Sequence, residues 1–495
     1  MNATKATAAH GTVALVFSQG CYLIIGYFVV VLLAREFGPV VYGTYGVIMS
    51  VLVWLEQSGT HAIPAATAKL LAETGTGRGE LERSALVLNL ALYTGFFAAL
   101  WLAAPWLASW FGIANGTFLL RLAALDLPFF GVYTAYQAIH QGKNHFFRLG
   151  ATQITYALGK LAGTLLIIRF GVSLEAALLV NAAATVMGLL CLLPGIAPPW
   201  QGAALEKIGP LLTVGIPIGC YHVLLSVRTW LLLWMLQIMS AESEKAAIGV
   251  FVAAWNIARL PSLALNQITT VILPSLSRAL ALNNPNLVRR YIHQALRFGL
   301  MVNLPVCLVL ATQPDALMQW IYSRDFSGGG TVLCLLIVGE ALRVFHAIFG
   351  SILSAAGEAR KASVVTMISF VPYILLLLLL IPVCGPVGAA LSGALVVAGC
   401  VLIFGIIVWR RFGTLMNGRS ARNIGLAGCL MFSVFAVAPK LDVLFILPYV
   451  GGLITYVVTL FVCREITRED FATFLPWLRV KPEIEDKPLR LPGSG

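Results

Sequence analysis

Long apolar runs, each about the length of a bilayer crossing, follow one another along most of the 495 residues. A membrane-spanning helix needs roughly 20 mainly apolar residues. Hydrophobic residues make up 59% of the chain and charged residues 11%, whereas soluble domains carry about 25% charged residues. Such a chain cannot cover itself with a polar surface. We therefore predict an all-α polytopic membrane protein, in which each helix satisfies its own backbone hydrogen bonds.

Cutting the apolar runs at charged residues, glycines and prolines predicts about 14 transmembrane helices. Of the Lys and Arg residues, 23 then lie in segments on the side of the N-terminus and five in segments on the other side. Positive charge gathers on the cytoplasmic side of membrane proteins, so both termini are expected there. The same bias explains the net charge of +12 without a nucleic-acid partner. The predicted spans are 13–34, 40–63, 84–110, 117–139, 151–168, 172–194, 211–238, 248–274, 296–313, 331–354, 362–383, 386–409, 424–440 and 443–463.

Similar short segments recur in the same order in two parts of the chain. Residues 41–45 and 247–251 are similar at an offset of 206, Gly142 and Gly357 at 215, and residues 171–178 and 385–391 at about 213. Transporters are often built from such repeats, with the binding site between them. We predict two six-helix bundles related by pseudo-symmetry, followed by two more helices. The expected domains are 1–205, 206–412, 413–463 and a cytoplasmic tail, 464–495.

Four segments at helix junctions resemble a known family. The sequence LAREFGP at 33–39, followed by YGTY at 42–45, resembles the first-to-second helix junction of the polysaccharide transporter (O-antigen flippase) family. ILPSLSR at 272–278, IYSRDF at 321–326 and AGEARK at 356–361 are similar to later junctions of that family. The resemblance covers roughly residues 10–460 and is shared in part with lipid II flippases and multidrug extruders of the same multidrug/oligosaccharidyl-lipid/polysaccharide exporter superfamily.

The resemblance implies an activity and a place in the cell. It implies transfer of an undecaprenyl-diphosphate-linked oligosaccharide from the inner to the outer leaflet of the bacterial inner membrane, for surface polysaccharide biosynthesis. A lipid-linked oligosaccharide diphosphate is then the substrate, and polysaccharide polymerases are candidate partners.

Ionisable residues inside the predicted spans point to a wet cavity. Each costs roughly 2.5–3.5 kcal/mol at the bilayer centre, so each needs a polar cavity or a partner. Five are basic and three acidic, and this excess of positive charge suits a diphosphate. The residues predicted to form a cationic substrate cavity are Arg259, Lys160, Arg228, Arg343, Arg121, Asn256 and Asn266. The acidic residues, with an ion-coupling or ion-pairing role, are Asp126, Glu340 and Glu56.

Helical spacing only partly distinguishes residues that line a cavity from residues that hold helices together. Arg259 shares a helix face with Asn256 and Asn266, and Lys160 shares one with Gln153 and Tyr156. Either face could line a cavity or hold helices together. Arg228 lies on a weaker polar face, for which both interpretations stay open.

The remaining charges allow structural roles. Arg343 follows Glu340 by three residues, which permits an intrahelical ion pair. Arg121 lies near a helix end and could reach the membrane interface. Asp126 could meet Lys160 or Arg259, or carry a coupling proton. Glu56 is expected simply to reach the interface.

Motifs of catalysis are missing from the sequence. It contains no glycine-rich phosphate loop, metal-ligand spacing or nucleophile–base arrangement, so we expect neither an enzyme nor a cofactor. Transport energy would then come from an ion gradient or the membrane potential. A cation-coupled multidrug extruder and a lipid II flippase are the alternatives. The extruder is disfavoured because 13–34 and 211–238 contain no carboxylate, and a membrane glycosyltransferase because the outer loops are short.

Overall fold

The computed structural model describes residues 2–73, 78–193, 207–241, 244–437 and 446–465. Within these ranges the chain is helical apart from short connections, and no strand occurs there. The all-α prediction is confirmed, and each of the predicted spans coincides with helix over most of its length. The predicted tail lies outside the described residues from position 466 onward.

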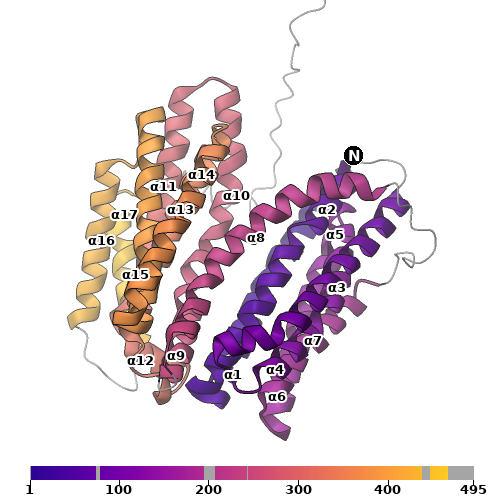
Figure 1. The fold of residues 1–495 in the computed structure, drawn as a ribbon. Helices are drawn as coiled ribbons and strands as arrows, with labels where there is room; N and C mark the ends of the chain where they lie inside the picture. The colour runs from indigo at the N-terminus through magenta and orange to yellow at the C-terminus, as the bar shows by residue number, and fades with distance from the viewer. Residues whose placement is uncertain (1, 74–77, 194–206, 242–243, 438–445, 466–495) are drawn as a thin grey trace, which may run out of the picture.

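The helices form two groups (Figure 1). The first group comprises α1 (Asn2–Thr60), α2 (Ile63–Glu73), α3 (Arg78–Phe111), α4 (Gly116–Ala124), α5 (Asp126–Gly142), α6 (Phe146–Phe170) and α7 (Leu174–Leu190). The second comprises α9 (Lys245–Ala258), α10 (Leu260–Ala281), α11 (Pro285–Thr312), α12 (Pro314–Ile321), η3 (Arg324–Phe326), α13 (Gly330–Ala355), α14 (Ala359–Ile368), α15 (Phe370–Phe412), α16 (Gly418–Val437) and α17 (Ile446–Val462).

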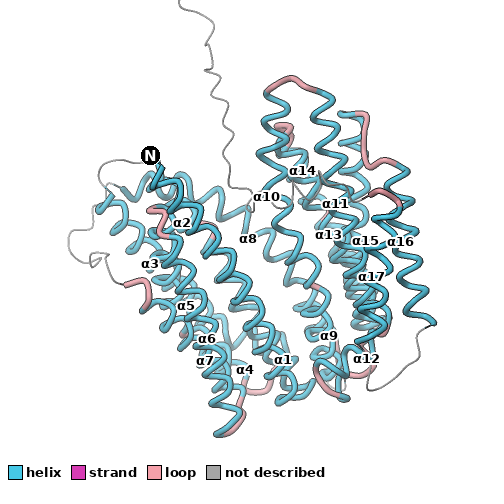
Figure 2. Tube along the Cα trace, turned by 180° about the vertical axis from the view of Figure 1, so that it is seen from behind, coloured by secondary structure: helices cyan, strands magenta, loops and turns pink. Residues whose placement is uncertain are grey.

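Helix α8 (Ile208–Met239) runs diagonally between the two groups and contacts both, packing on α1, α2 and α3 as well as on α15. Figure 2 shows from behind that the groups converge at the end where α9 and α12 lie and diverge at the end of the N-terminus. We call these the contact end and the open end. The predicted domain boundaries stay a prediction, because α8 contacts helices of both groups.

Two helices are long enough to hold two spans each. Helix α1 has 59 residues and α15 has 43, whereas a bilayer core of about 30 Å takes about 20 residues. Each is interrupted by a glycine with positive φ followed by a proline: Gly38 at 66° and Gly385 at 53°. Glycine adopts this backbone conformation without a steric penalty, and proline cannot donate the next helical hydrogen bond. The breaks therefore separate the predicted spans 13–34 and 40–63, and 362–383 and 386–409.

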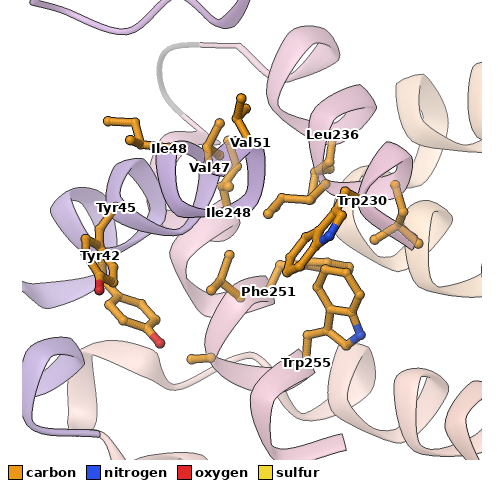
Figure 3. Close-up of a cluster of buried hydrophobic side chains, with 14 of the residues drawn as sticks. Tyr42, Tyr45, Val47, Ile48, Val51, Trp230, Leu236, Ile248, Phe251 and Trp255 are labelled. Carbon is orange, nitrogen blue, oxygen red and sulfur yellow. The ribbon is translucent and has the colours of Figure 1, made fainter. Parts of the chain in front are cut away.

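A buried apolar cluster joins the groups at the contact end (Figure 3). The cluster includes Tyr42 and Ile48 of α1, Trp230 of α8, and Phe251 and Trp255 of α9. Tyr42 and Phe251 are almost fully shielded from solvent. Large aromatic side chains contribute most of the apolar area in such clusters, so the contact end is held by a true hydrophobic core.

Glycines allow α1 and α9 to approach closely at this core. A Cβ atom on Gly43 would lie 2.8 Å from the backbone nitrogen of Gly249, and one on Gly249 would lie 2.6 Å from the carbonyl carbon of Pro39. Gly43 and Gly249 occupy matching positions in the two similar segments 41–45 and 247–251. The segments that are equivalent in sequence therefore pack against each other.

Polar contacts also link the two groups at the contact end. The Arg35 guanidinium donates to the carbonyl oxygens of Trp320 and Ile321 at 2.6 and 2.7 Å. Asn256 Nδ2 donates to the Tyr42 hydroxyl at 3.0 Å. Lys245 Nζ donates to the Gly112 carbonyl at 2.9 Å. Arg35 and the 321–326 segment, both singled out in sequence, thus meet at this end.

Candidate functional site: a cationic cavity and a buried acidic cluster

A cavity of about 250 Å³ lies in the second group, among α8, α9, α13, α14 and α15. Its charged and titratable lining residues are Arg228 of α8, Glu340, Arg343 and His346 of α13, and Tyr373 of α15. The three α13 residues follow one another at spacings of three, which places them along one side of the helix. Helix α13 therefore supplies most of the polar wall, and α8 supplies a second arginine opposite it.

The cavity carries more positive than negative charge. Arg343 Nε lies 3.3 Å from Glu340 Oε2, and the Glu340 side chain is 5% exposed whereas that of Arg343 is 45% exposed. The carboxylate is thus buried beneath a guanidinium that reaches the open space. Arg228 lies over the Tyr373 ring, with its Cζ atom 6.0 Å from the ring centroid. The His346 ring stacks on Phe404 at 4.9 Å.

Arg259 lies next to this cavity, at the break between α9 and α10. Its guanidinium carbon is 5.7 Å from the ring centroid of Trp255, which lines the cavity. Glu340 and Arg343 are close enough to interact with it electrostatically. Arg343 and Arg259 therefore lie near the Glu340 carboxylate, and Arg228 lines the same cavity. A guanidinium presents a planar fork of donors that matches phosphate oxygens, so this arrangement can bind a phosphate or diphosphate.

A second group of charges is buried among the helices of the first group. Lys160 Nζ of α6 donates to Asn181 Oδ1 of α7 at 2.6 Å, and Asn181 Nδ2 donates to Asp126 Oδ2 of α5 at 2.8 Å. The Glu56 carboxyl of α1 lies within hydrogen-bonding reach of Asp126. Asp126 is 1% exposed. We call Glu56, Asp126, Lys160 and Asn181 the acidic cluster, since two carboxyl groups face one ammonium group.

The acidic cluster can hold a proton or a cation. Two carboxylates that share a buried site repel each other, so one of them gains a proton or attracts a positive ion. Glu56 Oε1 and Asp126 Oδ1 are buried and lack a hydrogen-bond partner among the described residues. Buried polar atoms are normally paired, so these two oxygens mark the place where such an ion would bind.

The structure divides the predicted cationic cavity into two sites. Arg228, Arg343 and Arg259 come together in the second group, whereas Lys160 lies in the acidic cluster of the first group. The predicted ion pair of Glu340 with Arg343 is confirmed. Asp126 lies near Lys160, one of its two predicted partners. The expectation that Glu56 reaches the interface is wrong, because the start of α5 brings Asp126 against it.

Two further predicted residues, Arg121 and Asn256, are not among the residues that line the 250 Å³ cavity. Arg121 lies 5.1 Å from the ring of Trp101 and donates to its carbonyl oxygen. Asn256 bonds to Tyr42 across the contact end. The side chain of Asn266 lies outside the described residues.

Sequence reasoning missed three polar residues of these sites. His346 follows Arg343 by three residues, a spacing that already indicated one helix face. Asn181 is a buried amide within an otherwise apolar helix, which is a signal for a polar partner. Tyr373 offered no comparable signal, because a lone tyrosine in an apolar span is ordinary core.

Comparisons with known proteins agree with this fold. A family model described as polysaccharide biosynthesis protein matches residues 8–280, more than half of the chain. The chain belongs to this family. The probable low-salt glycan biosynthesis flippase Agl15 of Haloferax volcanii is 23% identical over 366 residues, which are 73% of this chain and 75% of that protein.

Two solved structures share the fold of this protein. The lipid II flippase MurJ in an inward closed conformation has a TM-score of 0.77 at 16% identity, with 94% of this chain and 99% of that chain covered. An inward-facing multidrug resistance MATE family transporter of the MOP superfamily has a TM-score of 0.67 at 14% identity, covering 78% and 94%. The polysaccharide biosynthesis family member is thus a multi-pass membrane protein with the fold of these transporters, as the resemblance implied.

Proposed function

We propose that this protein is a flippase that moves an undecaprenyl-diphosphate-linked oligosaccharide across the bacterial inner membrane by alternating access. The cavity formed by Arg228, Arg343 and the neighbouring Arg259 is the observation that carries the proposal. Its guanidinium groups provide the charge and the donor geometry that a diphosphate needs. Family membership supports a role in polysaccharide biosynthesis, and the outer-leaflet product would be available to polysaccharide polymerases.

The positions of the charged loops support the proposed orientation in the membrane. The contact end carries Arg35, Lys245 and Arg324, which belong to segments expected outside the cell. The open end carries Arg360, Arg410 and Arg411 and the N-terminus, which are expected inside. This arrangement supports an orientation in which the helix groups diverge toward the cytoplasm, where a substrate from the inner leaflet would enter.

A flipping assay in proteoliposomes tests the role of the cavity. Arg228→Ala and Arg343→Ala should each lower the flipping rate of a fluorescent undecaprenyl-diphosphate oligosaccharide at least about ten-fold, because each removes a charged donor to phosphate. Arg228→Lys should keep part of the rate, since the charge stays but the fork is lost. Arg169→Ala, at an exposed position in the last turn of α6, is the matched control and should leave the rate unchanged.

Competing cargoes decide between the proposal and its alternatives. Lipid II and a lipophilic cationic dye are offered in the same vesicles. A faster rate with lipid II would favour lipid II flipping, and a faster rate with the dye would favour multidrug extrusion. Normal flipping by the Arg228 and Arg343 variants would remove the cationic cavity from the mechanism.

The acidic cluster is our candidate for energy coupling. An ion that enters between Glu56 and Asp126 would relieve the repulsion of their carboxylates, and its release on the other side would drive the cycle. In the Glu56→Gln and Asp126→Asn variants, the flipping rate should therefore no longer respond to an imposed proton or sodium gradient. Both variants should still flip the substrate when no gradient is imposed. Glu80→Gln, exposed in the first turn of α3, should respond as the unaltered protein does. A full gradient response in both cluster variants would contradict the coupling role.

A further inference from the structure

Three tyrosines form a row of rings in the first helix group, beside the acidic cluster. The Tyr22 ring of α1 lies 5.9 Å from that of Tyr156 on α6, and Tyr156 lies 6.1 Å from Tyr133 on α5, with the last two nearly parallel at 20°. Gly188 of α7 leaves room for the row, because a Cβ atom there would lie 3.0 Å from the Tyr133 ring and 3.3 Å from Tyr156. The rings thus come from α1, α5 and α6, and α7 packs against two of them.

The ring of Tyr22, at one end of the row, is exposed. Tyr133 is 6% exposed and Tyr156 is half-buried, whereas Tyr22 is 38% exposed. Tyr22 is also close enough to Glu56 to interact with it electrostatically, so it lies near the interior charges of the group. In both views α1 runs along the side of the first group that faces the second group. The Tyr22 ring is therefore exposed at a position close to these interior charges, where a ligand can reach it.

Polar groups border the row of rings. The Tyr156 hydroxyl donates to Asn181 Oδ1 at 3.3 Å, and Lys160 Nζ lies 6.0 Å from the Tyr156 ring centroid. Near Tyr22 on the same helix, Ser18 Oγ lies 3.5 Å from Gln153 Oε1. The site therefore combines a flat apolar face with hydroxyl, amide and ammonium groups around it.

This combination fits a sugar ring. A pyranose has an apolar C–H face, which packs on an aromatic face, and a rim of hydroxyl groups, each of which needs a donor or acceptor. We propose that Tyr22, supported by Tyr156 and Tyr133, is a binding platform for the oligosaccharide of the lipid-linked substrate. The inference rests on the proposed function for the identity of the lipid carrier. In this proposal the two ends of the substrate head group bind to different helix groups. The diphosphate binds in the arginine cavity, and the glycan binds on the tyrosine row.

Binding of two ligands to the full-length detergent-solubilised protein tests the platform. One ligand is undecaprenyl diphosphate, and the other is the lipid-linked oligosaccharide fraction extracted from the membranes of the cells that make this protein. The unaltered chain should bind the glycosylated ligand more tightly. Tyr22→Ala should remove this preference, a loss of about ten-fold, and Tyr22→Phe should keep most of it, because the aromatic face remains.

Controls separate a glycan site from a general defect. Affinity for undecaprenyl diphosphate should be the same in the unaltered, Tyr22→Ala and Tyr22→Phe proteins, whereas Arg228→Ala should weaken both ligands. Phe28→Ala removes a 52% exposed ring from the same helix and should change neither affinity. Equal weakening of both ligands by Tyr22→Ala, or a preserved preference for the glycosylated one, would overturn the platform.

A failure of the proposed function would look different. In that case the unaltered protein would bind neither lipid diphosphate. The oligosaccharide released from the same extract by mild acid then decides the platform by itself. Binding of the free oligosaccharide that Tyr22→Ala weakens and Tyr22→Phe keeps would support a carbohydrate site, and no binding of it would reject the site.

Discussion

Gly249→Ala is expected to slow flipping strongly, although it adds a single methyl group. The new Cβ would clash with the Pro39 carbonyl, a backbone group that cannot rotate away. Overpacking of a well-packed core costs about 1–3 kcal/mol, and a backbone contact is harder to relieve than a side-chain contact. Helices α1 and α9 would have to separate, so the state in which the contact end is closed would be disfavoured by about five-fold to more than a hundred-fold.

Two measurements check the Gly249→Ala prediction. The flipping rate in proteoliposomes should fall at least about ten-fold, and hydrogen exchange of residues 245–258 should become faster as the contact end opens. Gly399→Ala is the matched control, because a Cβ atom at that α15 position meets nothing within 4 Å. Its flipping and exchange should match those of the unaltered protein. Normal flipping and unchanged exchange in Gly249→Ala would show that the tight crossing is not needed.

Replacing Lys160 with methionine is expected to destabilise the protein strongly. The ammonium group donates to Asn181 and faces the carboxyl groups of Glu56 and Asp126 within the first helix group. Removal of one partner from a buried charge group leaves the other without compensation, which costs about 3–5 kcal/mol. The thermal unfolding temperature in detergent and the amount of inserted protein should both fall.

A double variant separates charge balance from packing. Asp126→Asn combined with Lys160→Met removes one charge of each sign, so at least half of the lost stability should return. Lys361→Met is the exposed control: its side chain is 63% exposed, and its partner Glu358 is also bonded by Arg411. An exposed ion pair contributes under about 1 kcal/mol to the free energy of unfolding. The unfolding temperature of Lys361→Met should therefore barely change. A double variant no more stable than Lys160→Met would exclude charge balance as the cause.

Buried charges in the two groups serve different chemistry. Around the cavity the arginines outnumber the carboxylate, and Arg343 reaches open space although it is paired with Glu340. In the acidic cluster the carboxyl groups outnumber the lysine, and the charges bond to one another through Asn181. Excess positive charge favours an anionic cargo, and excess negative charge favours a cation. This asymmetry is the physical basis for proposing diphosphate binding in one group and ion coupling in the other.

The pattern of residues in the sequence was sufficient to predict the membrane-spanning helices and one ion pair within a helix. The apolar runs predict the spans because a bilayer requires about 20 apolar residues and internally satisfied backbone groups, whatever the neighbouring helices do. The Glu340–Arg343 pair follows from a spacing of three within one helix. The glycine–proline breaks at Gly38 and Gly385 are likewise local.

Contacts between helices that are distant in the sequence could not be predicted from the residue pattern. Lys160 and Arg259 look alike in sequence, since each is a cation on a polar helix face. In the fold, Lys160 lies against an amide and two carboxyl groups on α7, α1 and α5, whereas Arg259 lies near Glu340 and Arg343 of α13. Helical periodicity states which side of its own helix a residue occupies, but not which helix stands opposite. Packing across the bundle therefore decided which charges form the cavity, which form the acidic cluster, and that Asn256 ties the two groups together.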